Sequence, residues 1–170
     1  MQNEVMFIKD NNVGIITLNR PERLNALTYS MVEQISETLS LWETDNNISC
    51  VIIEGAGDRS FCAGGDVVKL RKEVLADGGP PTDLSRAFFY DEYTLNYKIS
   101  NYKKPFISLI NGYTMGGGVG VSMHGSHIVG SEKTLFAMPE TAIGLFPDVG
   151  GGWLLGQLDS GIGAWLSLVG

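Results

Sequence analysis

The amino-acid sequence predicts an α/β fold. Short runs rich in β-branched residues alternate with segments whose apolar residues recur at helical spacing, and this alternation is typical of parallel sheets covered by helices. The chain has 170 residues, of which 44% are hydrophobic and 18% are charged, as in an ordinary globular protein. We expect one domain over residues 1–170. In such folds, ligands bind where strands lead into helices.

The first elements are a hairpin, a helix and a buried strand. Val5–Lys9 and Val13–Leu18 have the character of two strands joined by a polar turn. Thr28 is a suitable N-cap for a helix that continues to about residue 43. Its apolar residues recur at helical spacing: Met31, Val32, Ile35, Leu39 and Trp42. Ser49–Ile53 then predicts a buried strand, so that a βαβ crossover follows the hairpin.

The middle of the chain repeats this pattern with one strong break. Residues 55 to 65 are expected to form a loop, and Val67–Leu75 a helix. The segment Asp77–Pro81 ends that helix and is the best candidate for a mobile segment. Helical spacing resumes over Leu84–Ser100, and Phe106–Ile110 predicts another buried strand.

The last third is expected to contain shorter elements: a helix over 117 to 124, strands near 128 to 129 and over Leu135–Ala137, and a helix near 150 to 158. Ala164–Val169 has the pattern of the first turns of an apolar helix, and nothing in the sequence supplies a partner for its apolar face. We therefore expect the chain to be the N-terminal part of a longer protein.

Charge and composition exclude several classes of protein. Twelve basic and nineteen acidic side chains give a net charge of -7, and no basic stripe suggests a nucleic-acid partner. No apolar run approaches the ~18 residues that a membrane span requires. Cys50 and Cys62 cannot form a disulfide framework, and His124 and His127 do not readily supply a metal cluster. A reducing compartment suits this composition.

Glycine is the one unusual feature of the composition. Thirteen of the 22 glycines fall within residues 55–65, 112–120 and 144–152. Because glycine allows close backbone approach and positive φ, these clusters are typical of loops that present peptide N–H groups to a ligand. Tight turns and close helix packing are the alternative. None of the clusters matches a dinucleotide-binding or phosphate-loop motif.

Five longer strings carry the strongest signal, in this order: Asn19 to Leu27 (NRPERLNAL), Ser60 to Asp66 (SFCAGGD), Asn111 to Gly118 (NGYTMGGG), Met138 to Thr141 (MPET) and Phe146 to Gly152 (FPDVGGG). Together they resemble the enoyl-CoA hydratase/isomerase (crotonase) superfamily, and the residues after Gly118 narrow the resemblance toward the 3-hydroxyisobutyryl-CoA hydrolases. The resemblance covers essentially the whole chain.

This resemblance implies an α/β fold of the crotonase type, in which ββα units repeat in a spiral core, without the C-terminal helical region of the hydrolases. It also implies an oxyanion hole formed by the N–H groups of Gly65 and Gly117, which stabilises the charge on a thioester carbonyl. The implied coenzyme A contacts are Arg23, Leu24, Ala63, Gly65, Asp66 and Val67. A solvated surface charge is the alternative interpretation of Arg23.

The acid and base groups distinguish the reactions within the superfamily. Hydratases hold a water molecule with two glutamates, and the first of these positions is Gly120 here. Glu140 is retained, and Asp148 stands where many hydratases have glycine, as in the hydrolases. The resemblance implies that Glu140 attacks the carbonyl or activates water, and that Asp148 assists proton delivery and binds the substrate hydroxyl. Glu92 is expected to orient that hydroxyl.

Each carboxylate also has a structural interpretation. Glu140 follows a proline and could serve as a favourable charge in a first helical turn. Asp148 and Glu92 could be solvated side chains. Cys62 lies inside the predicted oxyanion loop, but the resemblance uses the backbone there, and a small packing side chain is the better interpretation. His124 could likewise be a packing histidine.

The predicted function is hydrolysis of a short branched 3-hydroxyacyl-CoA thioester, namely 3-hydroxyisobutyryl-CoA to 3-hydroxyisobutyrate and coenzyme A, in valine catabolism. A hydratase or isomerase of the same superfamily and a non-catalytic acyl-CoA-binding or assembly domain are the alternatives. No metal or redox cofactor is implied, since coenzyme A belongs to the substrate. The resemblance also suggests a trimer-based homo-oligomer, in the cytoplasm of a bacterium or the mitochondrial matrix or peroxisome of a eukaryote.

Overall fold

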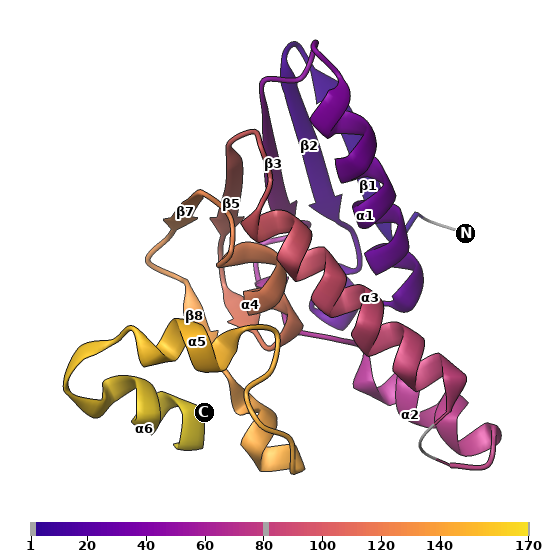
Figure 1. Ribbon diagram of the computed structural model, residues 1–170, viewed down its shortest axis with the longest axis vertical. Coiled ribbons are helices and arrows are strands. Elements are labelled where there is room, and N and C mark those ends of the chain that lie inside the picture. Colours follow the sequence, from indigo (N-terminus) through magenta and orange to yellow (C-terminus); the bar gives the residue numbers. More distant parts are fainter. Residues whose placement is uncertain (1–2, 80–81, 170) are drawn as a thin grey trace.

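Two sheets organise the computed structural model, which describes residues 3–79 and 82–169 (Figure 1). A five-stranded sheet has the order β1-β2-β3-β5-β7, and a three-stranded sheet has the order β4-β6-β8. The strands are β1 (Val5–Asp10), β2 (Val13–Leu18), β3 (Cys50–Gly55), β4 (Ser60–Cys62), β5 (Phe106–Ile110), β6 (Tyr113–Met115), β7 (His127–Gly130) and β8 (Leu135–Ala137).

Six α-helices and three 3-10 turns connect and cover these strands within the described part of the chain. The α-helices are α1 (Tyr29–Thr44), α2 (Val67–Ala76), α3 (Asp83–Ser100), α4 (Gly117–Ser122), α5 (Gly151–Gly156) and α6 (Ile162–Val169). The 3-10 turns are η1 (Pro21–Arg23), η2 (Pro139–Ile143) and η3 (Asp159–Gly161). None of the helices in these described ranges is long and apolar enough to cross a membrane.

The order of elements confirms the repeated ββα unit. In each repeat the first strand joins the large sheet and the second joins the small sheet: β3 and β4 precede α2, β5 and β6 precede α4, and β7 and β8 precede η2. β1 and β2 pair antiparallel as the expected hairpin, whereas β2, β3, β5 and β7 pair in parallel. The chain therefore moves sideways by one strand in both sheets with each repeat.

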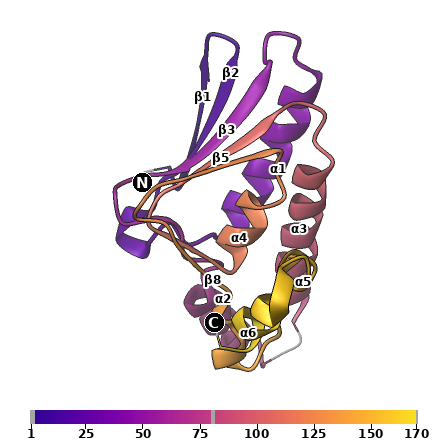
Figure 2. The ribbon, with the colours of Figure 1, turned by 90° about the vertical axis from the view of Figure 1, so that its left-hand side faces the viewer.

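The main core lies where α1 and α3 cover one face of the large sheet (Figure 2). α1 begins after Thr28, whose side chain accepts a hydrogen bond from the N–H of Met31, as the sequence predicts. The buried residues of α1 are the five predicted ones: Met31, Val32, Ile35, Leu39 and Trp42. Burial of this apolar stripe, rather than helix propensity alone, holds the helix on the sheet.

Two short strands were not predicted. Residues 55 to 65, expected to form a loop, contain β4, and β6 lies just before α4. Each strand has only three residues, and their partners are distant in sequence: Ser60 pairs with Tyr113, and Tyr113 with Leu135. The helix expected near 150 to 158 is limited to α5, and the helix expected over 117 to 124 ends at Ser122. The predicted mobile segment includes Pro80 and Pro81, which lie outside the described residues.

Candidate active site

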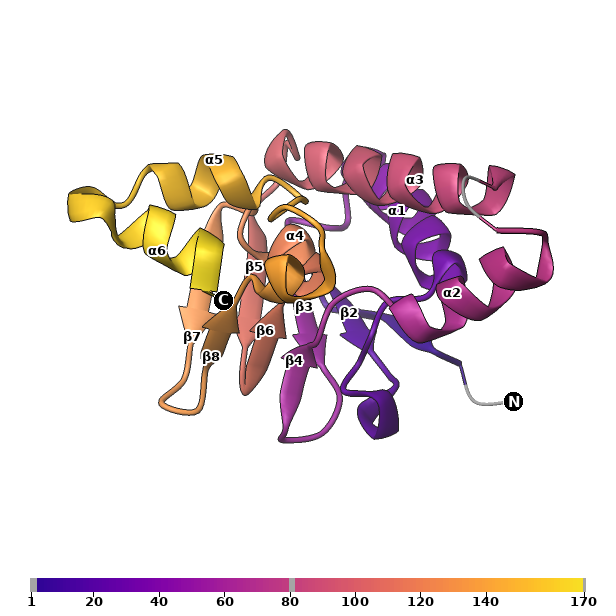
Figure 3. The same cartoon turned by 90° about the horizontal axis from the view of Figure 1, so that it is seen from below.

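A cleft of about 320 Å³ is lined by residues of α2, α3, the start of α4 and η2. Figure 3 shows how α2, α3 and α4 lie beside the two sheets. Glycine backbone and three carboxylates form its polar part, and aliphatic and aromatic side chains form the rest. The residues lining it are Ala63, Gly64, Gly65, Val67, Leu70, Phe88, Phe89, Glu92, Gly116, Gly117, Pro139, Glu140, Ala142, Ile143, Leu145 and Asp148. The cleft thus brings together residues from three successive repeats.

Gly65 and Gly117, the predicted oxyanion donors, lie side by side in this cleft. A Cβ atom on Gly117 would lie 3.2 Å from the Gly65 nitrogen and 2.5 Å from Oε1 of Glu92. Within the described residues, the N–H groups of Gly65 and Gly117 donate no hydrogen bond to another protein atom. Gly117 is the first residue of α4, where backbone N–H groups are free of helical partners. Both donors are therefore available to a ligand.

Gly116 shows why a side chain is not tolerated beside these donors. Its backbone has a positive φ of 50°, and a Cβ atom there would lie 2.6 Å from Oε1 of Glu140. A non-glycine residue would meet both backbone strain and a steric clash with the carboxylate. The glycine-rich string is thus required by the close approach of Glu140.

The three predicted carboxylates converge on the cleft from different elements. Glu92 comes from α3, Glu140 from η2 and Asp148 from the segment before α5, and their exposed fractions are only 3%, 7% and 8%. Oε2 of Glu140 is buried without a hydrogen-bond partner in the described residues. A buried carboxylate with a free oxygen is chemically suited to act as a base or nucleophile.

Burial raises the pKa of Glu92 to about 8, with further increases from the nearby charges of Asp148 and Glu140. Burial also raises the pKa of Glu140, and Asp148 adds to that effect. Glu92 is therefore mostly protonated at pH 7. In this form it does not repel negative charge beside Gly117, whereas an ionised carboxylate at the same place would oppose an oxyanion.

Tyr93 is a site residue that the sequence analysis missed. Its hydroxyl donates a hydrogen bond of 2.7 Å to Oδ2 of Asp148. Burial and this contact raise the pKa of Tyr93 well above its ordinary value, so the hydroxyl remains a donor. The contact joins α3 to a segment 55 residues away, and no local pattern in the sequence indicates it. Tyr93 fixes the orientation of the Asp148 carboxylate.

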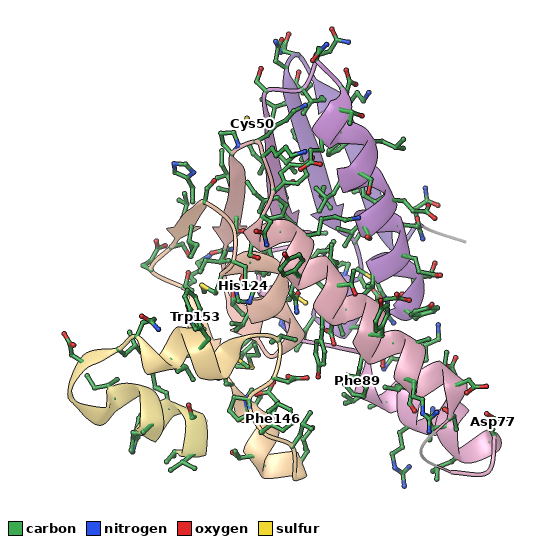
Figure 4. All side chains as sticks on the ribbon, viewed as in Figure 1. Cys50, Asp77, Phe89, His124, Phe146 and Trp153 are labelled. Atoms are coloured by element: carbon green, nitrogen blue, oxygen red, sulfur yellow. The ribbon has the colours of Figure 1, made fainter. Side chains whose placement is uncertain are left out.

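Asp148 also borders a second cavity, of about 520 Å³. Figure 4 shows His124 and Phe146, which line it from α4's C-terminal side and from the segment between η2 and α5. Nε2 of His124 lies 2.6 Å from the carbonyl oxygen of Val149, so this side chain packs and bonds within the protein, as expected. Asp148 therefore lines both the cleft and the second cavity.

The predicted coenzyme A contacts divide into two groups. Ala63, Gly65 and Val67 line the cleft, whereas Arg23, Leu24 and Asp66 are not among its lining residues. These assignments stay predictions. Arg23 is exposed on η1, and the carbonyl of Leu24 accepts a hydrogen bond of 3.0 Å from the N–H of Ala63.

Cys62 is fully buried, and burial raises its pKa to about 12. It is therefore a neutral thiol that packs beneath the oxyanion loop, in agreement with the sequence interpretation. In the described ranges, no group of three or more His, Cys, Asp or Glu side chains is placed to hold a metal ion.

Gly120 occupies a position where no carboxylate would fit without rearrangement. A Cβ atom there would lie 2.8 Å from both amide atoms of Asn96 and 2.8 Å from Cβ of Val149. Asn96 is 5% exposed, and its amide fills the space that a larger side chain at residue 120 would need. The site therefore contains Glu140, from the string Met138 to Thr141, but no glutamate from α4.

These features define a cleft in which two backbone N–H groups, without protein acceptors among the described residues, lie beside three buried carboxylates. The chain belongs to the enoyl-CoA hydratase/isomerase family, whose sequence profile matches residues 13–170. This finding confirms the family resemblance and the fold predicted from the sequence.

Within the family, the chain is similar to curated proteins named 3-hydroxyisobutyryl-CoA hydrolase, mitochondrial. It is 52% identical over 168 residues to the protein from Danio rerio, covering 98% of this chain and 43% of the relative. It is 49% identical over 167 residues to the human protein, covering 98% of this chain and 42% of the relative. The chain thus spans about two fifths of the length of these relatives.

Solved structures agree on the fold but have different titles. A structure titled enoyl-CoA hydratase, from Rhodobacter sphaeroides 2.4.1, has a TM-score of 0.94 and 42% identity, covering 99% of this chain and 49% of the other. A structure titled carnitinyl-CoA dehydratase, from Mycobacterium thermoresistibile, has a TM-score of 0.92 and 43% identity, covering 98% and 48%. The fold is therefore shared by proteins named for different reactions.

Proposed function

We propose that this protein hydrolyses a short branched 3-hydroxyacyl-CoA thioester, with 3-hydroxyisobutyryl-CoA as the substrate. One observation carries the proposal: Glu92, Glu140 and Asp148 surround the free N–H groups of Gly65 and Gly117 in one cleft. The names of the curated relatives support the substrate, and the reaction would belong to valine breakdown.

In the proposed reaction, the thioester oxygen lies between the N–H groups of Gly65 and Gly117, which stabilise its negative charge as the carbonyl carbon is attacked. Glu140 either activates a water molecule for this attack or attacks directly and is released by water. In both routes a C–O bond forms at the acyl carbon, the C–S bond breaks, and one water molecule is consumed, which supplies the proton of the thiol. Water gives its oxygen to the acid when it attacks the acyl carbon; when it attacks the glutamyl carbon of the acyl-enzyme, the acid keeps the oxygen of Glu140 and Glu140 takes the oxygen of water. Asp148, oriented by Tyr93, passes the proton to the leaving sulfur.

Asp148 and Glu92 also provide polar contacts for the 3-hydroxyl group of the substrate. Glu92 is protonated at neutral pH, so it can donate a hydrogen bond as well as accept one. Asp148 already accepts from Tyr93 and retains acceptor capacity for a second donor. A substrate that lacks the hydroxyl would leave these buried groups without a partner, which disfavours its binding.

A hydratase is the second candidate, because solved relatives are titled hydratase and dehydratase. Hydration adds water across a double bond and requires a water held between two groups. Residue 120 is glycine and not the second glutamate of the hydratases. Asn96 and Val149 occupy the space that a side chain at this position would need. The site therefore favours thioester hydrolysis over hydration.

The test measures thiol release from 3-hydroxyisobutyryl-CoA by the natural full-length protein, with crotonyl-CoA as a control substrate. Glu140→Gln should lower kcat for thiol release by at least about 100-fold, because the base or nucleophile is lost. Glu37→Gln, which changes an exposed glutamate of α1, is the matched control and should retain full activity.

Hydration of crotonyl-CoA without thiol release would replace the proposal with the hydratase. Binding of the acyl-CoA without either reaction would instead support a non-catalytic acyl-CoA-binding domain. Labelled water in a single turnover tests direct attack by Glu140: label in this side chain would show that it attacked the carbonyl and that water then attacked the glutamyl carbon.

We further propose that the working protein requires no metal or redox cofactor and forms a trimer-based homo-oligomer, which light scattering would test. The curated relatives are named as mitochondrial. For a eukaryotic source, we therefore propose the mitochondrial matrix as its location, and for a bacterial source the cytoplasm.

A further inference from the structure

Arg20 is a buried cation that connects three segments behind the cleft. It is 9% exposed and lies between β2 and η1. Nη2 bonds Oδ2 of Asp66 at 2.9 Å, Nε lies 3.1 Å from Oε1 of Glu4, and Nη1 donates to the carbonyl of Ala26 at 2.6 Å. Each guanidinium nitrogen therefore has its own acceptor. A planar guanidinium is suited to holding several acceptors in a fixed arrangement.

The Asp66 contact reaches directly into the oxyanion loop, since Asp66 follows Gly65. Oδ1 of Asp66 accepts a hydrogen bond of 3.0 Å from the N–H of Lys69 and so caps the start of α2. Although burial opposes it, this hydrogen bond and the contact with Arg20 hold the pKa of Asp66 below its ordinary value. Both carboxylate oxygens of Asp66 are thus used within the protein.

Backbone hydrogen bonds fix the same loop to the segment that Arg20 holds. Leu27 donates to the carbonyl of Gly64 and accepts from the N–H of Asp66, both at 2.8 Å. These bonds hold the residues on either side of Gly65 and leave its own N–H free for a ligand. Because Arg20 donates hydrogen bonds to both Ala26 and Asp66, one side chain connects the two paired segments.

We propose that Arg20 is a positioning residue for the oxyanion hole, acting through Asp66 to hold the N–H of Gly65 in place. This inference rests on the proposed thioester hydrolysis. A backbone donor stabilises an oxyanion only when it is fixed before the charge develops. Release of Asp66 should therefore weaken binding of the transition state more than binding of the substrate.

Glu4 provides a matched control on the opposite side of the same guanidinium. It also pairs with Arg20, and its other oxygen accepts a hydrogen bond of 2.8 Å from Thr28, at the start of α1. Glu4 has no contact with the loop of Gly65 among its described hydrogen bonds and ion pairs. Removing this pair tests the structural contribution of Arg20 without releasing the loop.

The experiment compares Asp66→Asn, Arg20→Lys and Glu4→Gln in the natural full-length protein. Asp66→Asn should lower kcat for thiol release about 10-fold with KM changed less than about twofold, because a misplaced donor affects the transition state. Arg20→Lys keeps the positive charge but loses the planar guanidinium that holds three acceptors, so it should also lower kcat. Glu4→Gln should keep kcat within about twofold of the natural protein, even if its melting temperature falls as far as that of Asp66→Asn.

Hydrogen exchange gives a second readout that does not depend on activity. Peptides spanning residues 63–68 should exchange faster in Asp66→Asn than in the natural protein or in Glu4→Gln. If the natural protein releases no thiol, the proposed function fails, and this exchange pattern still decides whether Arg20 and Asp66 anchor the loop.

Four results would overturn the inference. Unchanged kcat in Asp66→Asn would show that the contact does not position the donor. A rise in KM at constant kcat would make Asp66 a contact for coenzyme A. An equal loss of kcat in Glu4→Gln, or unchanged exchange of the loop in Asp66→Asn, would make the role of Arg20 purely structural.

Discussion

Two buried regions of this molecule lie side by side and differ in what they bury. Beneath α1, the core is built from apolar side chains such as Ile35 and Leu39, which are fully excluded from solvent. In the cleft, Glu92, Glu140 and Asp148 are nearly as inaccessible, with exposed fractions of 3% to 8%. Burial stabilises the fold in the first region and changes proton affinity in the second.

The same degree of burial has opposite consequences for the free energy of unfolding in the two regions. An apolar side chain in the core gains from leaving water, whereas a buried carboxylate loses solvation and becomes harder to ionise. Substitutions in the core should therefore change stability without changing chemistry. Substitutions of the carboxylates in the cleft should change the chemistry with little loss of stability, or should even stabilise the fold.

Leu39→Ala should produce the largest effect on stability. It removes a fully buried side chain of α1 and should lower the free energy of unfolding by about 3 to 5 kcal/mol. Denaturant titration measures this loss, and kcat of the fraction that remains folded should be unchanged. A lowered kcat in that folded fraction would show that the two regions are coupled.

Gly117→Ala should affect the cleft as strongly as Leu39→Ala affects the core, but in activity. The added methyl group would lie 2.5 Å from Oε1 of Glu92 and 3.2 Å from the Gly65 nitrogen. We expect kcat for thiol release to fall about 100-fold, close to the loss of one oxyanion donor. Stability should change little, since alanine favours the helix that begins there. Retained activity would show that the cleft accommodates the methyl group without displacing the donors or Glu92.

Glu92→Gln should have the smallest effect and the most informative sign. Because the folded-state pKa of Glu92 is raised from 4.5 to about 8, the folded protein holds a proton that the unfolded chain releases. The contribution of this proton to the free energy of unfolding is then fully present below about pH 4.5 and is lost as pH rises through 8.

The glutamine variant does not ionise, so its free energy of unfolding should exceed that of the natural protein by about 1 to 3 kcal/mol at pH 8. Near pH 4 the two proteins should be equal. Urea titrations at several pH values measure the difference, with Glu37→Gln, on the exposed side of α1, as the control. A difference that grows toward low pH would contradict the assigned shift.

The elements that the sequence predicts well are those with enough residues to show a period. The hairpin, α1 and α3 each have an extended pattern of apolar residues, and the structure confirms them. β4 and β6 have three residues each, which is too short for a period to appear. They exist because the repeated units place them beside each other, and this is a property of the whole fold.

The same distinction applies to the site. Glu92, Glu140 and Asp148 were predicted because each lies in a string that resembles the family, and the fold brings all three to one cleft. Tyr93 and Arg20 were missed because their partners lie 55 and 46 residues away. A hydroxyl or a cation has no local signature of the carboxylate that it will meet, so only tertiary structure shows these contacts.

The two proposed oxyanion donors of the cleft belong to the main chain. Every residue except proline carries an N–H group, so side-chain substitutions elsewhere in the cleft can exchange one reaction for another without deleting the donors of Gly65 and Gly117. Structures that share this fold are titled as hydratase and dehydratase, while curated relatives are named as hydrolases. An oxyanion hole formed by main-chain groups is retained when catalytic side chains change, so related proteins can carry out different reactions at the same anion site.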